Sequence, residues 1–341
     1  MNERENYLKY LKKNDRRCFF QYEYGRIYSL FKHKNYHFNP KKVAGRKVMT
    51  REESNSYIAE MIESGKPFWL ARYGHTETAF LNSVLYDRFS EKPPVGQNYP
   101  LTKTIHMLYN NAGFFPEDIE EGKKYADMVI EAASEVDIHA TWELYMEDYI
   151  VSQYEKDSVV TRWGHIAPYY NRRENGDLPW THALKGKKVL VINPFAESIL
   201  KQYKENREHL FEKIYDADNI LPEFELKVLK AVQTVAEEKD SRFATWFEAL
   251  DWMIDECKKI DFDIALVGCG AYGYLLASAI KKMGKSAIQT CGSTQMMFGI
   301  LGSRWENDKR LMNEVVNEYW IHPSDNEVPA SAKNVEGGCY W

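Results

Sequence analysis

Short apolar runs alternate with amphipathic stretches along most of this 341-residue chain. Continuous runs rich in small or β-branched residues are typical of strands buried on both faces of a sheet. They predict strands at residues 67–71, 136–140, 189–192, within 224–233, at 264–268 and at 286–290. Helical spacing of apolar residues between these runs predicts helices at 50–64, 78–85, 101–113, 116–134, 195–211, 243–260 and 275–284. The alternation predicts an α/β fold: a Rossmann-like, three-layer, mostly parallel sheet with helices on both faces.

The two ends of the chain have different patterns. Residues 1–48 are rich in Lys, Arg and Tyr with weak helical spacing, which indicates an N-terminal helical extension to a single domain at 49–341. The basic, aromatic stretch 16–47 suits either contact with an anionic membrane surface or an exposed solvated face. Near the other end a helix is expected at 307–318, and the aromatic residues 336–341 are expected to dock on the domain.

Composition narrows the function classes. Hydrophobic residues make up 44% of the chain, enough for a sizeable core, and the net charge of −5 gives no electrostatic reason for nucleic-acid binding. Five widely spaced cysteines indicate neither a disulfide framework nor a C-x-x-C zinc site. The N-terminus has no apolar signal-peptide core, and no window approaches 18 apolar residues. These features predict a cytoplasmic protein, with association at the inner face of the membrane left open.

A glycine turn follows the strand at 264–268. Residues 268–273, GCGAYG, fit G-x-G-x-x-G and precede a helix that stops at Gly284. Backbone N–H groups and the helix dipole at such a turn favour a phosphate, so a nucleotide diphosphate is the expected ligand class, and a turn that only packs helix on sheet is the alternative. The next strand ends in Gln289 and Thr290 rather than an acidic residue, which disfavours NAD. A methyltransferase would carry this motif at the start of its domain, not near the end.

A second turn, RYGHTE, follows the strand at 67–71. Arg72 is suited to a phosphate, and His75 and Glu77 to one divalent cation. In the alternative interpretation Arg72 and Glu77 form a buried ion pair and His75 caps the helix. Because ligands of open α/β sheets bind outside the carboxyl ends of the strands, we expect the turns at 72–77, 193–197 and 268–273 to line one cleft.

Further polar and aromatic residues follow the predicted strands. Trp142, Glu143 and Tyr145 lie just past the strand at 136–140. The segment 158–186 suits an acceptor cleft or an ordinary surface loop, and its charged residues are Arg162, His165, Arg172 and Arg173.

Several strings taken together resemble one bacterial family that is similar to glycosyltransferases of the GT-D fold. They are the R-[FY]-G-x-x-E turn RYGHTE, NPFAES, the QY…R…LF…LPEFELK…VQT run, GCGAYG and FGILGSRW, and they cover nearly all of residues 50–341. GT-D enzymes hold a divalent metal and the diphosphate of a nucleotide sugar with a D-x-E motif in the first turn. Arg72, Gly74 and Glu77 match that turn, whereas His75 stands at the place of the aspartate.

The resemblance implies a glycosyltransferase that moves a sugar from a UDP-type donor to a glycan or lipid-linked acceptor in surface polysaccharide synthesis. Arg72, His75 and Glu77 are the expected catalytic residues, with Mn²⁺ or Mg²⁺ on His75 and Glu77 or, alternatively, His75 on the donor phosphates. Candidate bases are Glu77, Glu143 and Glu197. The expected donor-binding residues are Arg72, Gly74, Asn193, Glu197, Gly268, Gly270, Tyr272 and Gly273. An NAD- or S-adenosylmethionine-dependent enzyme and a non-catalytic nucleotide- or glycan-binding protein are the alternatives.

Overall fold

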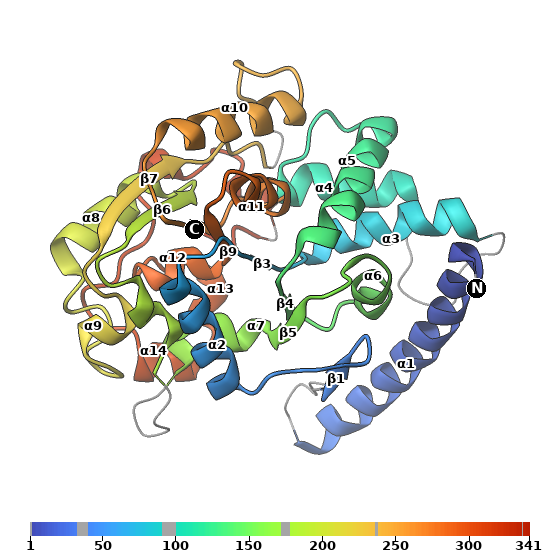
Figure 1. The fold of residues 1–341 in the computed structure, drawn as a ribbon, viewed down its shortest axis with the longest axis horizontal. Coiled ribbons are helices and arrows are strands. Elements are labelled where there is room, and N and C mark those ends of the chain that lie inside the picture. Colours follow the sequence, from blue (N-terminus) through green and yellow to red (C-terminus); the bar gives the residue numbers. More distant parts are fainter. Residues whose placement is uncertain (1, 33–39, 91–99, 172–177, 236–237, 336) are drawn as a thin grey trace.

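The computed structural model describes residues 2–32, 40–90, 100–171, 178–235, 238–335 and 337–341 (Figure 1). Its centre is a seven-stranded sheet in which all strand pairs are parallel, in the order β5-β4-β3-β9-β8-β6-β7. The strands are β3 (Trp69–Ala71), β4 (Ile138–Thr141), β5 (Val159–Arg162), β6 (Lys188–Asn193), β7 (Glu225–Lys230), β8 (Ile264–Val267) and β9 (Ser286–Gln289). The α/β prediction is confirmed.

Helices cover both faces of this sheet. Successive side chains of a strand point to opposite faces, so each strand contributes residues to two separate cores. Ala265 and Val267 of β8 pack in one core, and Ile264 and Leu266 in the other. The first core packs against α1 (Glu3–Lys32), α3 (His75–Phe89), α4 (Leu101–Ala112), α5 (Ile119–Ala132), α6 (Glu147–Tyr154), α10 (Trp246–Lys259) and α11 (Tyr272–Lys282). The second packs against α2 (Arg51–Ser64), α7 (Trp163–Ile166), α8 (Ala196–Asn206), α9 (Ala217–Ile220), α12 (Ser293–Met297), α13 (Ser303–Glu306) and α14 (Lys309–Glu314).

Local signals explain where several helices begin and end. At the start of α2 the Thr50 hydroxyl accepts from the Glu53 N–H while the Glu53 side chain accepts from the Thr50 N–H, so two donors at the helix end are satisfied. Gly65 ends the same helix with a left-handed φ of 66°. Gly284 follows α11 with a φ of 78°. These boundaries agree with those expected from the sequence.

Other boundaries were predicted wrongly. Residues 159–162, placed in a loop or cleft segment, form the edge strand β5; only its two middle residues are fully buried, so it has no long apolar run. The helix expected to reach residue 211 ends at Asn206, and the one expected at 307–318 is replaced by the short α13 and α14. Arg172, Arg173 and the loop at 91–99 lie outside the described residues.

The terminal segments pack on the domain. Helix α1 lies at the periphery (Figure 1) and contributes Tyr7 and Leu11 to the first core. A two-stranded hairpin, β1 (Lys42–Val43) and β2 (Arg46–Lys47), follows it. At the other end residues 337–341 dock as expected: Ser303 N–H donates to the Trp341 carbonyl and Arg304 N–H to the Cys339 carbonyl. Among the described residues, no helix combines the length and apolar character needed to cross a membrane.

Candidate functional site

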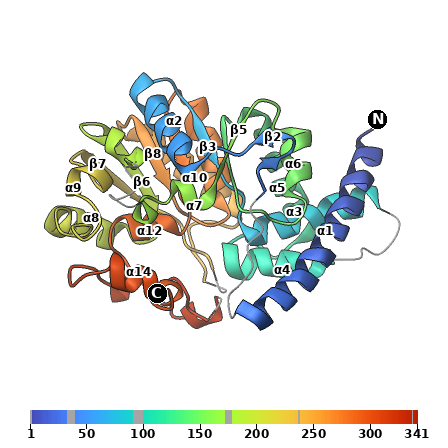
Figure 2. The ribbon, with the colours of Figure 1, turned by 90° about the horizontal axis from the view of Figure 1, so that it is seen from below.

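One cavity of about 420 Å³ opens at the carboxyl ends of the central strands. Its walls include residues of the turns after β3, β6, β8 and β9, so the structure brings the three predicted turns together. Figure 2 shows the C-terminal segment and the end of α4 on the same side of the sheet, where both contribute lining residues. The residues that line it and carry charged, aromatic or thiol groups are Arg72, His75, Glu77, Trp142, Trp163, Phe195, Cys269, Tyr272, Cys291, Arg304, Trp305, Tyr340 and Trp341.

Arg72 is the most unusual of these residues, because it is a buried cation that forms no ion pair with any other described residue. Only 6% of the residue is exposed, and its Nε has no hydrogen-bond partner. The guanidinium carbon lies 4.3 Å from the centre of the Trp142 ring and 5.3 Å from that of Trp163. Between these two described residues the structure shows no ion pair of Arg72 with Glu77. Burying an unpaired charge is costly, and an anionic ligand in the cavity would offset that cost.

His75 and Glu77 lie in the first turn of α3 and both line the cavity. Gly74, rather than His75, is the N-cap of this helix. A Cβ on Gly74 would lie 2.0 Å from a Glu77 carboxylate oxygen, so glycine leaves room for that carboxylate to fold back over the turn. Among the described residues there is no group of three or more His, Cys, Asp or Glu side chains able to hold a metal ion. The pair therefore offers at most two protein ligands.

The glycine turn after β8 lines the cavity with Gly268 and Gly270 and is also packed closely by the protein itself. A Cβ on Gly268 would lie 2.2 Å from Thr294 Oγ1, and one on Gly270, whose φ is 56°, would lie 2.7 Å from the Ala112 carbonyl oxygen. That carbonyl also accepts a hydrogen bond of 3.0 Å from the Ala271 N–H. Close packing against Thr294 and the end of α4 thus gives Gly268 and Gly270 a structural role, and both also line the cavity, as the phosphate-site interpretation expects.

Two further predicted donor-binding residues adjoin the turn. Gly273 faces Gln289: a Cβ there would lie 3.3 Å from the amide nitrogen. The Tyr272 ring lines the cavity and stacks on Trp246, with 4.9 Å between ring centres. Tyr272 is therefore available to a ligand along its edge, while Gly273 serves helix packing.

Asn193 and Glu197 were expected in the same turn, but only Asn193 lies at the cavity. Asn193 lines the cavity, but its amide donates to the Gly268 carbonyl at 2.8 Å and its Oδ1 accepts from the Phe195 N–H at 2.9 Å, so it braces the two turns. Glu197 lies outside the cavity lining, exposed, where it pairs with Lys230 at 3.3 Å. Its helix starts at the strand end, but the position faces away from the cavity, and the assignment of Glu197 to the site is wrong in geometry.

Of the segments expected to form an acceptor cleft, some residues line the cavity and others do not. Glu143 and Arg162 form an ion pair with each other and are not part of the lining. Burial, together with the nearby Arg51 and Arg162, lowers the pKa of His165 to about 4, so this imidazole is neutral at physiological pH. Trp163, from the same segment, does reach the cavity.

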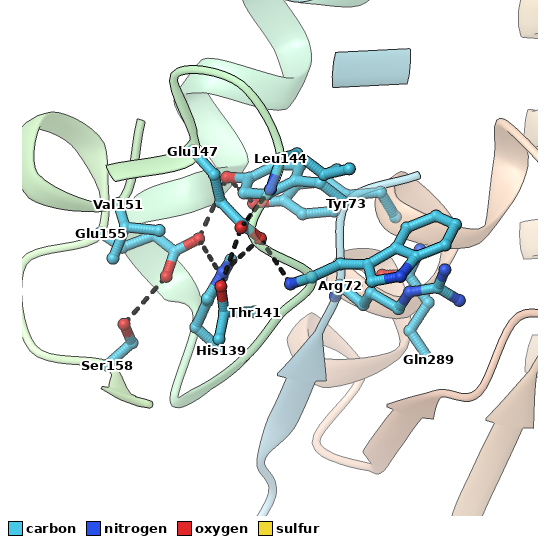
Figure 3. Close-up of polar contacts among 12 residues, drawn as sticks. Arg72, Tyr73, His139, Thr141, Leu144, Glu147, Val151, Glu155, Ser158 and Gln289 are labelled. Carbon is cyan, nitrogen blue, oxygen red and sulfur yellow. Dashed lines mark hydrogen bonds and ion pairs between the residues drawn. The ribbon is translucent and has the colours of Figure 1, made fainter. Parts of the chain in front are cut away.

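Sequence reasoning missed a buried acid–base network behind the cavity (Figure 3). His139 of β4 lies between Glu147 and Glu155, and all three are at most 1% exposed. The signal was weak: a lone histidine in an apolar strand, and two glutamates, one at the start of a short helix and one just after its end. A second missed feature is the aromatic wall of Trp305, Tyr340 and Trp341, brought to the cavity by the docked C-terminal segment.

No protein-family model, curated protein or solved structure matches this chain. The resemblance to GT-D glycosyltransferases therefore remains a prediction from the motifs.

Proposed function

We propose that the protein is a glycosyltransferase that binds the diphosphate of a nucleotide-sugar donor at Arg72 and transfers the sugar to a glycan or lipid-linked acceptor. One observation carries the proposal: a desolvated arginine, with no ion-pair partner among the described residues, lines the cavity at the carboxyl edge of the sheet. A planar guanidinium is well suited to bind two phosphate oxygens at once. The motif resemblance supports the reaction class.

The shape and charge of the cavity support an anionic, partly aromatic ligand. Its volume of about 420 Å³ lies within the usual range for small-molecule sites. Among the described lining residues, Arg72 and Arg304 oppose the one acidic side chain, Glu77. Trp305, Tyr340 and Trp341 offer ring surfaces for a base or a sugar. A nucleoside diphosphate sugar combines these properties in one molecule.

The proposed roles follow from position. Arg72 stabilises the charge that develops on the leaving diphosphate. Of the three candidate bases, Glu77 alone lines the cavity, while Glu143 and Glu197 do not. If Mn²⁺ or Mg²⁺ takes part, Glu77 and His75 are the residues that hold it, since an oxygen and an imidazole nitrogen suit such cations. The metal would add positive charge beside the leaving group.

A thermal-shift panel tests this proposal. We expect UDP-, GDP- or dTDP-sugars to raise the melting temperature by several degrees, since ligand at 100 times its Kd stabilises by about 2.7 kcal/mol. Each nucleotide is measured with Mn²⁺ and with EDTA, beside NAD and S-adenosylmethionine. Stabilisation by NAD or S-adenosylmethionine and by no nucleotide sugar would contradict the proposal. Binding of a nucleotide sugar without its turnover on any glycan acceptor would favour the non-catalytic alternative.

A further inference from the structure

His139 is held in its charged form between two carboxylates. Its Nδ1 lies 3.0 Å from Glu155 Oε1 and its Nε2 lies 3.1 Å from Glu147 Oε1 (Figure 3). Two carboxylate acceptors require an N–H on both ring nitrogens, and only the imidazolium has both. Burial by itself lowers the pKa of His139, but the charges and hydrogen bonds of Glu155 and Glu147 outweigh it and raise the pKa to about 10.

Glu147 also fixes the loop that follows β4. Its carboxylate accepts from the Thr141 hydroxyl at 2.8 Å, the Trp142 N–H at 3.1 Å and the Leu144 N–H at 3.0 Å. The loop is conformationally demanding, because Glu143 and Met146 have positive φ angles of 60° and 63°. Such angles are unfavourable for residues other than glycine, so the loop needs these bonds to keep its shape.

This loop presents Trp142, whose ring packs against the guanidinium of Arg72. On the other side of the network, Glu155 accepts from the Tyr73 hydroxyl at 3.1 Å, and that hydroxyl lies 2.9 Å from the hydroxyl of Tyr274. Tyr73 precedes Gly74 in the turn after β3, and Tyr274 belongs to α11. One buried histidine is thereby connected to three segments that form the cavity, although neither it nor its two carboxylates line it.

We infer that His139, Glu147 and Glu155 are positioning residues of the site: they hold Trp142 and Tyr73 so that Arg72 stays desolvated and turned to the cavity as its anion-binding group. The identity of the anion as a diphosphate rests on the proposed function. The role of these three residues in fixing the loop after β4 does not depend on which anion binds.

Hydrogen exchange and pyrophosphate binding, measured on the full chain, test the inference together. In Glu147→Gln we expect the amides of Trp142 and Leu144 to exchange at least tenfold faster than in the wild type, since an amide cannot accept from all the donors that the carboxylate serves. Inorganic pyrophosphate should bind about fivefold more weakly, because the loop no longer holds Trp142 against Arg72.

Asp148→Asn is the matched control. Asp148 is the next residue of α6 and is buried, but it pairs with Arg17 at 3.3 Å and Lys13 at 3.4 Å on α1 and not with the loop. It should lose stability yet keep both the exchange rates and the pyrophosphate affinity of the wild type. Equal effects of the two substitutions would reduce the network to a purely structural role and overturn the inference.

Thr141→Val provides a variant that is expected to fold even if Glu147→Gln does not, because it removes one hydroxyl at nearly constant volume. We expect about threefold faster loop exchange and about threefold weaker pyrophosphate binding, because the hydroxyl donates to Glu147 and accepts from the Glu143 N–H, and both bonds are lost. Unchanged exchange and affinity in Thr141→Val would contradict the inference. A wild type that binds no pyrophosphate, with loop exchange still accelerated in the variants, would contradict the proposed function and leave the positioning role supported.

Discussion

The turn after β3 and the turn after β8 are both predicted phosphate sites, and the structure treats them differently. The turn after β8 has the better-known glycine pattern and lines the cavity, but the carbonyl of Ala112 packs against its Gly270 and accepts from its Ala271 N–H. The turn after β3 has a less regular sequence, yet it presents the buried Arg72 with an unpartnered Nε. A glycine pattern therefore establishes only that a backbone approaches closely; the structure shows which backbone it is.

Substitution of the glycines in the turn after β8 tests the difference between the two turns most strongly. Gly268→Val and Gly270→Val should each destabilise the fold by about 3 kcal/mol or more, because a side chain there meets Thr294 or the Ala112 backbone, and at Gly270 the positive φ adds strain. Urea unfolding checks this.

Gly273→Ala is the control for the same turn. The added Cβ approaches only the Gln289 amide, at 3.3 Å, so the free energy of unfolding should change by less than about 1 kcal/mol. If Gly270→Val folds as stably as the wild type and loses pyrophosphate binding, the β8 turn is the anion site after all.

The next largest effect is expected on the pH dependence of stability, which tests the β3 side because Tyr73 of that turn donates directly to Glu155 of the charged network. The folded pKa of His139, about 10, lies above the ordinary value of 6.5. Its contribution is therefore fully present below about pH 6.5 and is lost as pH rises through 10. The neighbouring Tyr73 has a pKa well above its ordinary value, so it stays protonated over this interval.

We expect the difference in unfolding free energy between wild type and His139→Gln to shrink by several kcal/mol from pH 6 to pH 10. Urea titrations at three pH values measure it. A constant difference would mean that the buried histidine is neutral and that the network is held by other bonds.

Much of the fold could be predicted because it depends on local signals. Buried strands are short apolar runs, and the capping box at Thr50 and the left-handed Gly65 mark the ends of α2 directly. Edge strand β5 was missed since its partial burial leaves no such run. The local patterns therefore predicted the layered α/β arrangement, but they did not predict the lengths of the C-terminal helices.

The site could be predicted only in part, because its chemistry arises from long-range contacts. Arg72 stood out in its turn, but its burial depends on Trp142 and Trp163, which approach from other strand ends. His139 and Glu155 are 16 residues apart and meet only through the geometry of β4 and α6. Glu197 looked equivalent to Glu77 in sequence, yet it points out of the cavity.

The smallest effect concerns the ring packed on Arg72. Trp142→Ala should weaken pyrophosphate binding about fivefold, since a cation–π contact contributes about 1 kcal/mol. The cost in stability should be small, because Trp142 is 41% exposed. Trp142→Phe keeps a ring and should stay within about twofold of wild type. Isothermal titration of both variants checks this, and equal losses in Ala and Phe would point to the loop rather than the ring.

The central claim is that buried Arg72 binds an anion in the cavity. Titration of inorganic pyrophosphate into wild type, Arg72→Met and Arg304→Met tests this claim most directly. We predict that Arg72→Met weakens binding by at least about 30-fold, because a hydrogen-bonded charge pair is lost, while its free energy of unfolding stays equal or rises. Arg304→Met, which removes the exposed arginine on Tyr340, should change binding by less than about threefold. Unchanged pyrophosphate binding in Arg72→Met, or a loss of stability as large as its loss of binding, would contradict the account.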